Sequence, residues 1–218
     1  MPRSSPKSSK PAKVPVHRAP PPQQVRIIGG AWKRTPLPVL DALGLRPTPD
    51  RVRETLFNWI NHLRDGDWAQ ARCLDLFAGS GALGFEAASR GAQEVVMVDA
   101  NAQVMRQLES IRAKLKADNV VLQRGDAIAA AQALAGRGAR FDLVFLDPPY
   151  NQDFLSRSLP ACKGLLAPGA LVYAEAAAPL PFEEADGVPA WLDGWEVVRQ
   201  DKAGMVHFAL LRLGEIGE

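Results

Sequence analysis

Between residues 72 and 176, short apolar runs alternate with longer amphipathic stretches, and this pattern most narrows the folds open to the chain. It is typical of βαβ units, in which helices connect the strands of a parallel sheet. We expect strands near residues 72–77, 95–99, 120–124, 142–147 and 170–174, and helices near 82–90, 102–117, 127–135 and 153–166. Residues 195–213 contain two further runs around a tight turn at Ala203 and Gly204, which predicts an antiparallel hairpin at one sheet edge. The expected fold class is α/β, with a mostly parallel Rossmann-like sheet.

The charge of the chain is unevenly distributed. Residues 1–53 hold 11 Lys and Arg but only two acidic residues, whereas the remainder holds 15 basic and 22 acidic residues. Residues 1–24 are rich in Pro, Ser and Lys and have almost no large apolar groups, so we expect a disordered basic tail there. A basic front segment favours a polyanionic partner such as nucleic acid. The alternative is a solvated tail without a partner.

Two short elements are expected between the tail and the α/β pattern. Residues 25–39 predict a β-hairpin around Gly29 and Gly30, with Lys33 and Arg34 exposed on its second arm. A helix is expected to follow, with Thr48 as N-cap and Pro49 as its first residue. Its apolar stripe comprises Val52, Leu56, Trp59, Ile60 and Leu63. Arg51 and Arg53 fall off this stripe and are expected to face solvent or phosphate.

A glycine-rich turn follows the first strand of the α/β pattern. In "LDLFAGSGALGFEAA", Gly79, Gly81 and Gly84 form a G-x-G-x-x-G between a strand and a helix. Asp99 ends the next strand, where a carboxylate can hold both hydroxyls of a ribose. A nucleoside-containing cofactor is therefore expected, against the alternative of a tight turn without a ligand.

Asp75 discriminates between nucleoside cofactors. It lies four residues before Gly79, where a carboxylate would repel a pyrophosphate but suit the ammonium of S-adenosylmethionine (SAM). Its alternative role is to cap a nearby turn. Asp126 follows the third strand and is placed either to accept from the adenine amine or to cap the next helix. The expected cofactor-binding residues are Asp75, Phe77, Gly79, Gly81, Asp99, Ala100, Asp126 and Ala127.

The fourth strand runs directly into Asp147, Pro148, Pro149 and Tyr150. An exocyclic amine on a base is a poor nucleophile, because its lone pair is delocalised into the ring. The Asp147 carboxylate and the Pro148 carbonyl could accept its two N–H bonds, while the prolines fix the backbone. Tyr150 offers a face for stacking the base. We expect these four residues to be catalytic, against the alternative of a Pro-Pro turn that only ends a strand.

These motifs resemble a known family. "DLFAGSGALGFEAASRGA", "VDAN" and "LDPPY", preceded by "RIIGGAWKR" and "LRPTPDRVRETLFNWI", are similar to bacterial 16S ribosomal RNA guanine-N2 methyltransferases of the RsmD type. The resemblance implies a class I SAM-dependent methyltransferase with a seven-stranded sheet whose last strand is antiparallel. It also implies methylation of N2 of guanine 966 in 16S rRNA within the assembling small subunit. Members often have Phe where Tyr150 stands, and the tail is longer than the pattern requires.

The resemblance also assigns the front block to RNA. The expected RNA-binding residues are Arg26, Lys33, Arg34, Arg46, Thr48 and Arg51. Arg46 and Thr48 are further expected to border the cofactor cleft. We expect a methyltransferase domain over residues 25–218, composed of a hairpin and helix at 25–64 and a SAM-binding core at 70–218.

Other readings of the same motifs stay open. A DNA adenine-N6 methyltransferase needs the same acceptors, a non-catalytic RNA-binding assembly factor could keep the cofactor fold, and a dehydrogenase could use the glycines and Asp99. We expect a cytoplasmic protein in which Cys73 and Cys162 are reduced. We also expect no secretory signal, no membrane-spanning segment and no bound metal. A monomer is the default expectation.

Overall fold

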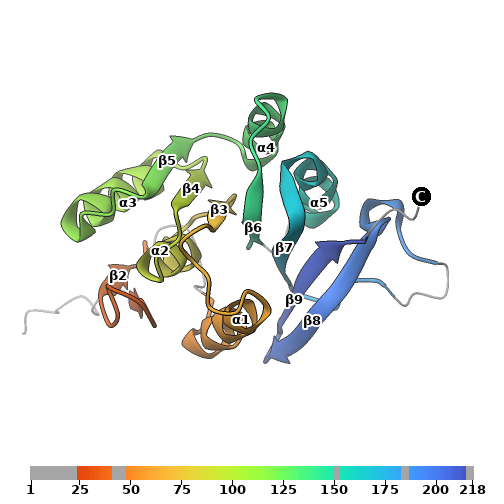
Figure 1. The fold of residues 1–218 in the computed structure, drawn as a ribbon, viewed down its shortest axis with the longest axis horizontal. Coiled ribbons are helices and arrows are strands. Elements are labelled where there is room, and N and C mark those ends of the chain that lie inside the picture. The colour runs from red at the N-terminus through yellow and green to blue at the C-terminus, as the bar shows by residue number, and fades with distance from the viewer. Residues whose placement is uncertain (1–23, 41–47, 150–152, 183–186, 215–218) are drawn as a thin grey trace, which may run out of the picture.

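The computed structural model describes residues 24–40, 48–149, 153–182 and 187–214. Its main sheet has seven strands in the order β5-β4-β3-β6-β7-β9-β8 (Figure 1). They are β3 (Arg72–Asp75), β4 (Glu94–Asp99), β5 (Val120–Arg124), β6 (Phe141–Leu146), β7 (Leu166–Ala176), β8 (Trp195–Ala203) and β9 (Val206–Leu213). β9 is antiparallel to both of its neighbours, and the other pairings are parallel. The predicted fold class and C-terminal hairpin are confirmed.

Helices cover both faces of this sheet (Figure 1). α1 (Asp50–Leu63), α2 (Ala82–Ser89) and α3 (Ala102–Leu115) pack on one face, while α4 (Ala127–Gly136) and α5 (Leu155–Cys162) pack on the other. Within β6, Leu143 and Phe145 face the first layer, and Val144 and Leu146 face the second. Burial on both faces explains why the sequence of this strand is an unbroken apolar run.

The expected helix at 153–166 is shorter in the structure. α5 ends at Cys162 and passes through a 3-10 turn, Lys163–Leu165, into β7, which begins at Leu166 rather than near residue 170. Pro160 lies inside α5 and has no N–H for the helical ladder, which favours an early end. A second 3-10 turn, Ala190–Leu192, precedes β8.

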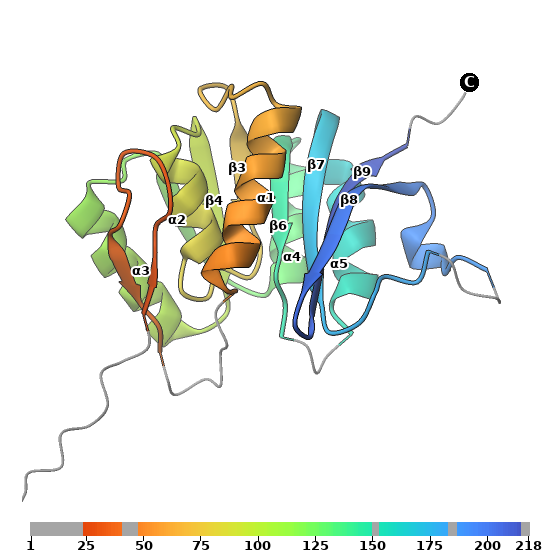
Figure 2. The same ribbon diagram turned by 90° about the horizontal axis from the view of Figure 1, so that it is seen from below.

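The N-terminal hairpin forms its own two-stranded sheet from β1 (Gln24–Arg26) and β2 (Pro36–Pro38). It lies beside α2 and α3 (Figure 2). Lys33 and Arg34 are exposed as predicted, but they occupy the turn and not the second arm. β1 begins at Gln24, the last residue of the expected tail, and residues 1–23 lie outside the described chain.

Glu86 attaches this hairpin to α2. Its side chain is fully buried and accepts from the backbone N–H groups of Ile28 at 2.6 Å and Gly29 at 2.9 Å. Glu86 also pairs with Arg90 at 2.8 Å. Gly30, at φ +72°, packs so closely that a Cβ would lie 1.9 Å from the Ser89 carbonyl oxygen, so only glycine fits there. Glu86 is therefore not a solvated residue of α2 but joins this helix to the hairpin.

The start of α1 also differs from the prediction. Pro49 occupies the N-cap position and Asp50 is the first helical residue, without a side-chain cap. Arg53 was expected to face solvent or phosphate but is fully buried. Its guanidinium group donates to Asp50 Oδ1 at 2.6 Å and to the Arg26 carbonyl at 2.8 Å. Buried charges of this kind are tolerated because they are paired and hydrogen-bonded.

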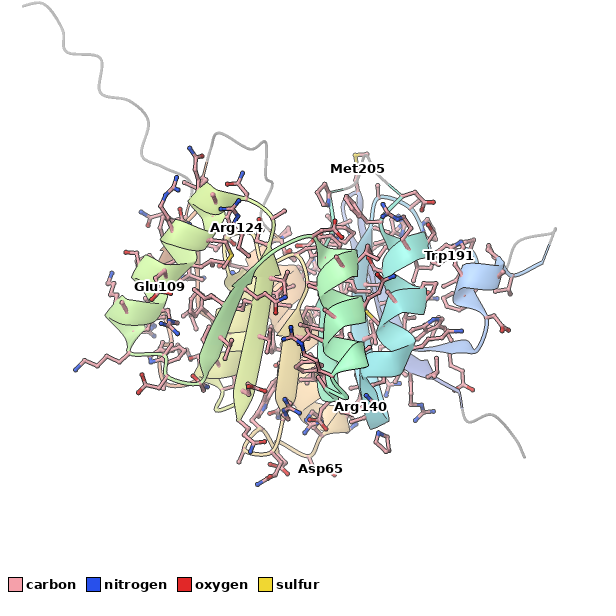
Figure 3. The ribbon with its side chains drawn as sticks, turned by 90° about the horizontal axis from the view of Figure 1, so that it is seen from above. Asp65, Glu109, Arg124, Arg140, Trp191 and Met205 are labelled. Atoms are coloured by element: carbon pink, nitrogen blue, oxygen red, sulfur yellow. The ribbon has the colours of Figure 1, made fainter. Side chains whose placement is uncertain are left out.

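The parallel strands end together at one edge of the molecule. Figure 3 shows Arg124, the last residue of β5, and Met205, in the turn between β8 and β9, at this edge. Arg140, just before β6, and Asp65 lie at the opposite edge (Figure 3). In open α/β sheets, ligands bind outside the carboxyl ends of the strands. Within the described residues, none of the helices has the length and apolar character needed to cross a bilayer, and both cysteines are buried and free.

Candidate active site

Strand register brings four polar side chains to one face of the sheet. Asp75 ends β3 and pairs with Phe145 of β6, which in turn pairs with Tyr173 of β7. Two residues further along, this register places Asp147 beside Glu175. Because side chains alternate along a strand, all of these residues point toward the face covered by α1 and α2. The site is thus built at the carboxyl ends of three adjacent strands.

The glycine loop connects β3 to α2. Gly79 and Gly81 adopt φ values of +50° and +80°, which L-residues with side chains rarely reach. A Cβ on Gly81 would lie 2.5 Å from the Phe85 ring, and one on Gly84 would lie 2.8 Å from the Met97 side chain. Gly81 therefore permits the turn and Gly84 permits close packing of α2 on the sheet. These roles confirm the tight strand-to-helix connection.

Asp75 lies beneath this loop and is almost fully buried. Its Oδ2 accepts from the Gly84 N–H at 3.1 Å, whereas Oδ1 has no hydrogen-bond partner among the described residues. Burial raises the pKa of Asp75 to about 7, against the lowering effect of the Phe77 and Gly84 backbone N–H groups. A buried carboxylate oxygen without a partner suits a cationic ligand group.

Asp99 fixes the other side of the loop. Its Oδ2 accepts from the Gly79 N–H at 3.0 Å, and its Oδ1 accepts from the Asn101 N–H at 2.8 Å. Ala100 follows it and is exposed. The structure thus places the end of β4 against the glycine loop, as a shared cofactor site requires. The contact with a ribose stays a prediction.

The remaining predicted cofactor residues surround this region. Asp126 is exposed and caps α4 by accepting from the Ala129 N–H at 2.9 Å, so its capping role is confirmed. Ala127 follows as the buried first residue of α4. Phe77 is half-buried, with its ring edge-on to Phe154 at a centroid distance of 5.3 Å.

Asp147 belongs to a network that the sequence did not reveal. The Thr48 hydroxyl donates to Asp147 Oδ2 at 2.8 Å and lies 3.1 Å from Glu175 Oε2. The Tyr173 hydroxyl donates to Glu175 Oε2 at 2.8 Å. Burial and then the negative charge of Glu175 raise the pKa of Asp147 well above its ordinary value. A Glu in the apolar stretch "LVYAEA" was the one sequence signal for Glu175.

Thr48 is therefore reassigned. It is only 3% exposed and its hydroxyl faces Asp147, so it is neither the N-cap of α1 nor free to contact RNA directly. Its expected position at the border of the cofactor cleft stays a prediction. Pro148 is buried and Pro149 is exposed, and Tyr150 and Arg46 lie outside the described residues.

The other predicted RNA-binding residues lie on the surface. Arg26, with 63% of its side chain exposed, pairs with Asp50 at 2.9 Å. Lys33, Arg34 and Arg51 are exposed. The described residues contain no group of three or more His, Cys, Asp or Glu side chains that could hold a metal ion.

A seven-stranded sheet with an antiparallel last strand, a glycine loop after β3 and acceptors after β6 define a class I SAM-dependent methyltransferase. The solved structure of yhhF from Escherichia coli has the same fold, with a TM-score of 0.72 and 39% identity over 88% of this chain and 99% of that one. HI0767 from Haemophilus influenzae aligns with a TM-score of 0.70 and 32% identity over 88% of this chain and all of that one (100%).

The chain belongs to the family described as Conserved hypothetical protein 95, whose model matches residues 25–212. It is 40% identical to Ribosomal RNA small subunit methyltransferase D of Escherichia coli K12 over 197 residues, which cover 89% of this chain and 93% of that protein. The protein of the same name from Haemophilus influenzae is 38% identical over 194 residues, covering 86% and 93%. The family resemblance stated from the motifs is confirmed.

Proposed function

We propose that this protein transfers a methyl group from SAM to the exocyclic N2 of a guanine in small-subunit ribosomal RNA. The observation that carries the proposal is the position of Asp147, which stands at the end of β6, next to the strand that ends in Asp75 and the glycine loop. An acceptor for an amine thus adjoins a site for a cationic nucleoside cofactor. Guanine 966 of 16S rRNA is the specific target expected from the family.

The residues of the cofactor side fit SAM. When bound, SAM supplies an electrophilic methyl group on a cationic sulfur. Asp75 would hold the ammonium of the methionine part through its unpaired Oδ1, and the backbone of Gly79 and Gly81 would permit close approach. Asp99 would hold the ribose and Asp126 the adenine, with Phe77, Ala100 and Ala127 lining the cleft.

The acceptor side would orient the target base. Asp147 and the Pro148 carbonyl would accept the two N–H bonds of the amine, which favours the pyramidal, nucleophilic form of the nitrogen. Pro149 would restrict the backbone, and Tyr150 would stack on the base after it leaves its neighbours.

The hairpin and α1 would hold the RNA backbone. Lys33 and Arg34 protrude from the hairpin turn, Arg26 and Arg51 are exposed nearby, and Arg46 precedes α1 in the sequence. Their contacts with phosphates would add affinity that falls with rising salt. The expected place of action is the cytoplasm, where small subunits assemble.

The proposal is tested with methyl-labelled SAM and undermethylated small ribosomal subunits, followed by digestion of the RNA and mass spectrometry of the nucleosides. We expect label in N2-methylguanosine, and loss of at least about a hundredfold in rate with Asp147→Ala. Arg140→Ala, on the opposite edge, should behave as the unmodified protein.

Each other outcome would replace the proposal. Label in adenine, with duplex DNA as the better substrate, would support a DNA adenine-N6 methyltransferase. Absence of label on particles and on naked RNA, with RNA binding intact, would support a non-catalytic assembly factor. Tight NAD binding without SAM binding would support a dehydrogenase.

A further inference from the structure

The hydroxyl of Thr48 contacts two carboxyl groups but has only one proton. It lies 2.8 Å from Asp147 Oδ2 and 3.1 Å from Glu175 Oε2, and the three residues come from the segment before α1, the end of β6 and β7. If both carboxyl groups were ionised, the hydroxyl could donate to only one of them. In the other contact, two oxygen lone pairs would face each other without a proton between them. A carboxylic proton on either Asp147 or Glu175 removes this conflict.

Burial makes such a proton stable. Thr48 and Glu175 are 3% and 2% exposed and Asp147 is half-buried, so two negative charges would be held side by side with less water than on the surface. The Tyr173 hydroxyl donates to Glu175 Oε2 at 2.8 Å and so helps to hold this carboxyl group in place. Burial, then the negative charge of Glu175 and, to a smaller extent, the interaction between the two carboxyl groups raise the pKa of Asp147.

Among the described residues, other charged groups near the pair lie on β3, α1 and β9. Asp75 of β3 adds a negative charge that disfavours ionisation of Asp147. Arg53 of α1 directs its Nε to the Thr48 carbonyl at 3.4 Å and its Nη2 to Asp50. On β9, Phe208 stands opposite Glu175, and His207 stands one position further along. The positive charge of Arg53 is thus already paired with Asp50.

We propose that Glu175 is a positioning residue that shares one proton with Asp147, directly and through the Thr48 hydroxyl, so that the pair can take up one more proton from the methylated amine. This inference rests on the proposed methyl transfer. As the carbon–nitrogen bond forms, the electron pair of the carbon–sulfur bond leaves with sulfur, and the nitrogen becomes cationic. The nitrogen then gives one proton to Asp147, and the pair, which carried one negative charge, becomes neutral. A neutral pair suits a buried site.

The proton can be observed without methylation. Infrared spectroscopy of the purified full-length chain, titrated with pH, detects the carbonyl band of a protonated carboxyl group. Because Asp75 titrates near pH 7, the measurement uses an Asp75→Asn background. We expect one carboxylic proton that persists well above the ordinary titration range of Asp and Glu.

Two substitutions should move this titration in opposite directions. Glu175→Gln removes the neighbouring negative charge, so loss of the band should shift to lower pH. Thr48→Val removes a donor to the carboxylate and should shift it to higher pH. Glu109→Gln, on the exposed surface of α3, is the matched control and should leave the titration unchanged.

The same variants, with Asp75 intact, are then assayed for methylation and SAM binding. Glu175→Gln should lower kcat about tenfold or more while leaving the Kd for SAM unchanged. An unchanged infrared titration in Glu175→Gln, or an unchanged kcat, would overturn the inference. If Glu175→Gln does not fold, Thr48→Val decides by its own shift. If the unmodified enzyme methylates no RNA, the proposed function fails, whereas the shared proton is still judged by the infrared result.

Discussion

Asp75 and Asp147 stand at the carboxyl ends of the neighbouring strands β3 and β6, and burial raises the pKa of both. Their partners differ. Asp75 accepts one backbone N–H from Gly84 and leaves Oδ1 without a partner among the described residues. Asp147 instead interacts with two side chains, the hydroxyl of Thr48 and the carboxyl group of Glu175.

This difference separates two ways of using a carboxyl group at the end of a strand. The described residues leave Asp75 Oδ1 without a hydrogen-bond donor, which a ligand from outside the chain can supply, and a cationic group suits it best. At Asp147, the proposed proton shared with Glu175 compensates the negative charge from inside the protein. Asp75 is therefore suited to binding, and Asp147 to receiving a proton during the reaction. The proposed cofactor and acceptor roles follow this division.

The largest effects should come from removing each carboxyl group in turn. Asp147→Ala should lower kcat roughly 10²- to 10⁴-fold and leave the Kd for SAM unchanged, because it removes an acceptor for the amine. Asp75→Ala should raise the Kd for SAM roughly 10- to 100-fold, because it removes a charge-assisted hydrogen bond. Calorimetry and single-turnover kinetics at saturating SAM separate the two effects.

The expected pattern is a crossed one. If Asp75→Ala lowered kcat at saturating SAM as strongly as Asp147→Ala does, the two carboxyl groups would not have separate roles. Equal SAM affinity of Asp75→Ala and the unmodified protein would remove Asp75 from the cofactor site.

A somewhat smaller effect concerns stability without a ligand. Asp75 has a pKa of about 7 in the folded protein against an ordinary value of 3.8. Between these values the unfolded chain releases the proton while the folded chain keeps it, so the contribution to stability is lost as the pH rises to 7. Asp75→Asn should therefore be more stable than the unmodified protein above pH 7, by at most about 4 kcal/mol.

Urea unfolding at several pH values measures this gain. It should be absent near pH 3, grow up to pH 7 and then stay constant. Saturating SAM should reduce or reverse it, because the ligand binds the protein that keeps the carboxylate more tightly and therefore stabilises it more. A gain that does not depend on pH would show that the charge of Asp75 is not its cause.

The parts of the molecule predicted from sequence are those that depend on local patterns. The apolar runs located the strands to within a few residues, because a strand that is buried on both faces consists almost entirely of apolar residues. The glycine spacing located the loop after β3. Asp147 was predicted to be an acceptor because it directly follows such a run, and this role stays a prediction. These features need no knowledge of distant contacts.

The buried charged residues were missed for the opposite reason. Glu86 binds backbone N–H groups 57 and 58 positions earlier, and Thr48 meets Glu175 across 127 positions. Arg53 was assigned to the surface because Arg usually lies there, while its partner at the Arg26 carbonyl belongs to another element. A charged residue within an apolar stretch, such as Glu86 or Glu175, indicates an unusual buried charge. The sequence does not show which group compensates that charge.

The smallest effect on SAM binding and stability should come from a substitution in the glycine loop that covers Asp75. In Gly81→Ala the new Cβ would lie 2.5 Å from the Phe85 ring and 2.8 Å from Leu108, at a φ of +80°. We expect a loss of roughly 1 to 3 kcal/mol in the free energy of unfolding, from strain and overpacking together. SAM affinity should fall severalfold because the loop shifts, whereas kcat at saturating SAM should change little.

Gly138→Ala separates the two causes of that loss. Gly138 has a φ of +72°, but a Cβ added there would meet no described atom within 4 Å, and the residue is exposed beyond the end of α4. It should show the strain alone, about 1 kcal/mol, with SAM affinity unchanged. The difference between the two variants in urea unfolding then measures the packing of the glycine loop on α2 and α3. Equal losses would mean that the loop relaxes freely, and the cofactor side of the site would be less rigid than the contacts around Gly81 indicate.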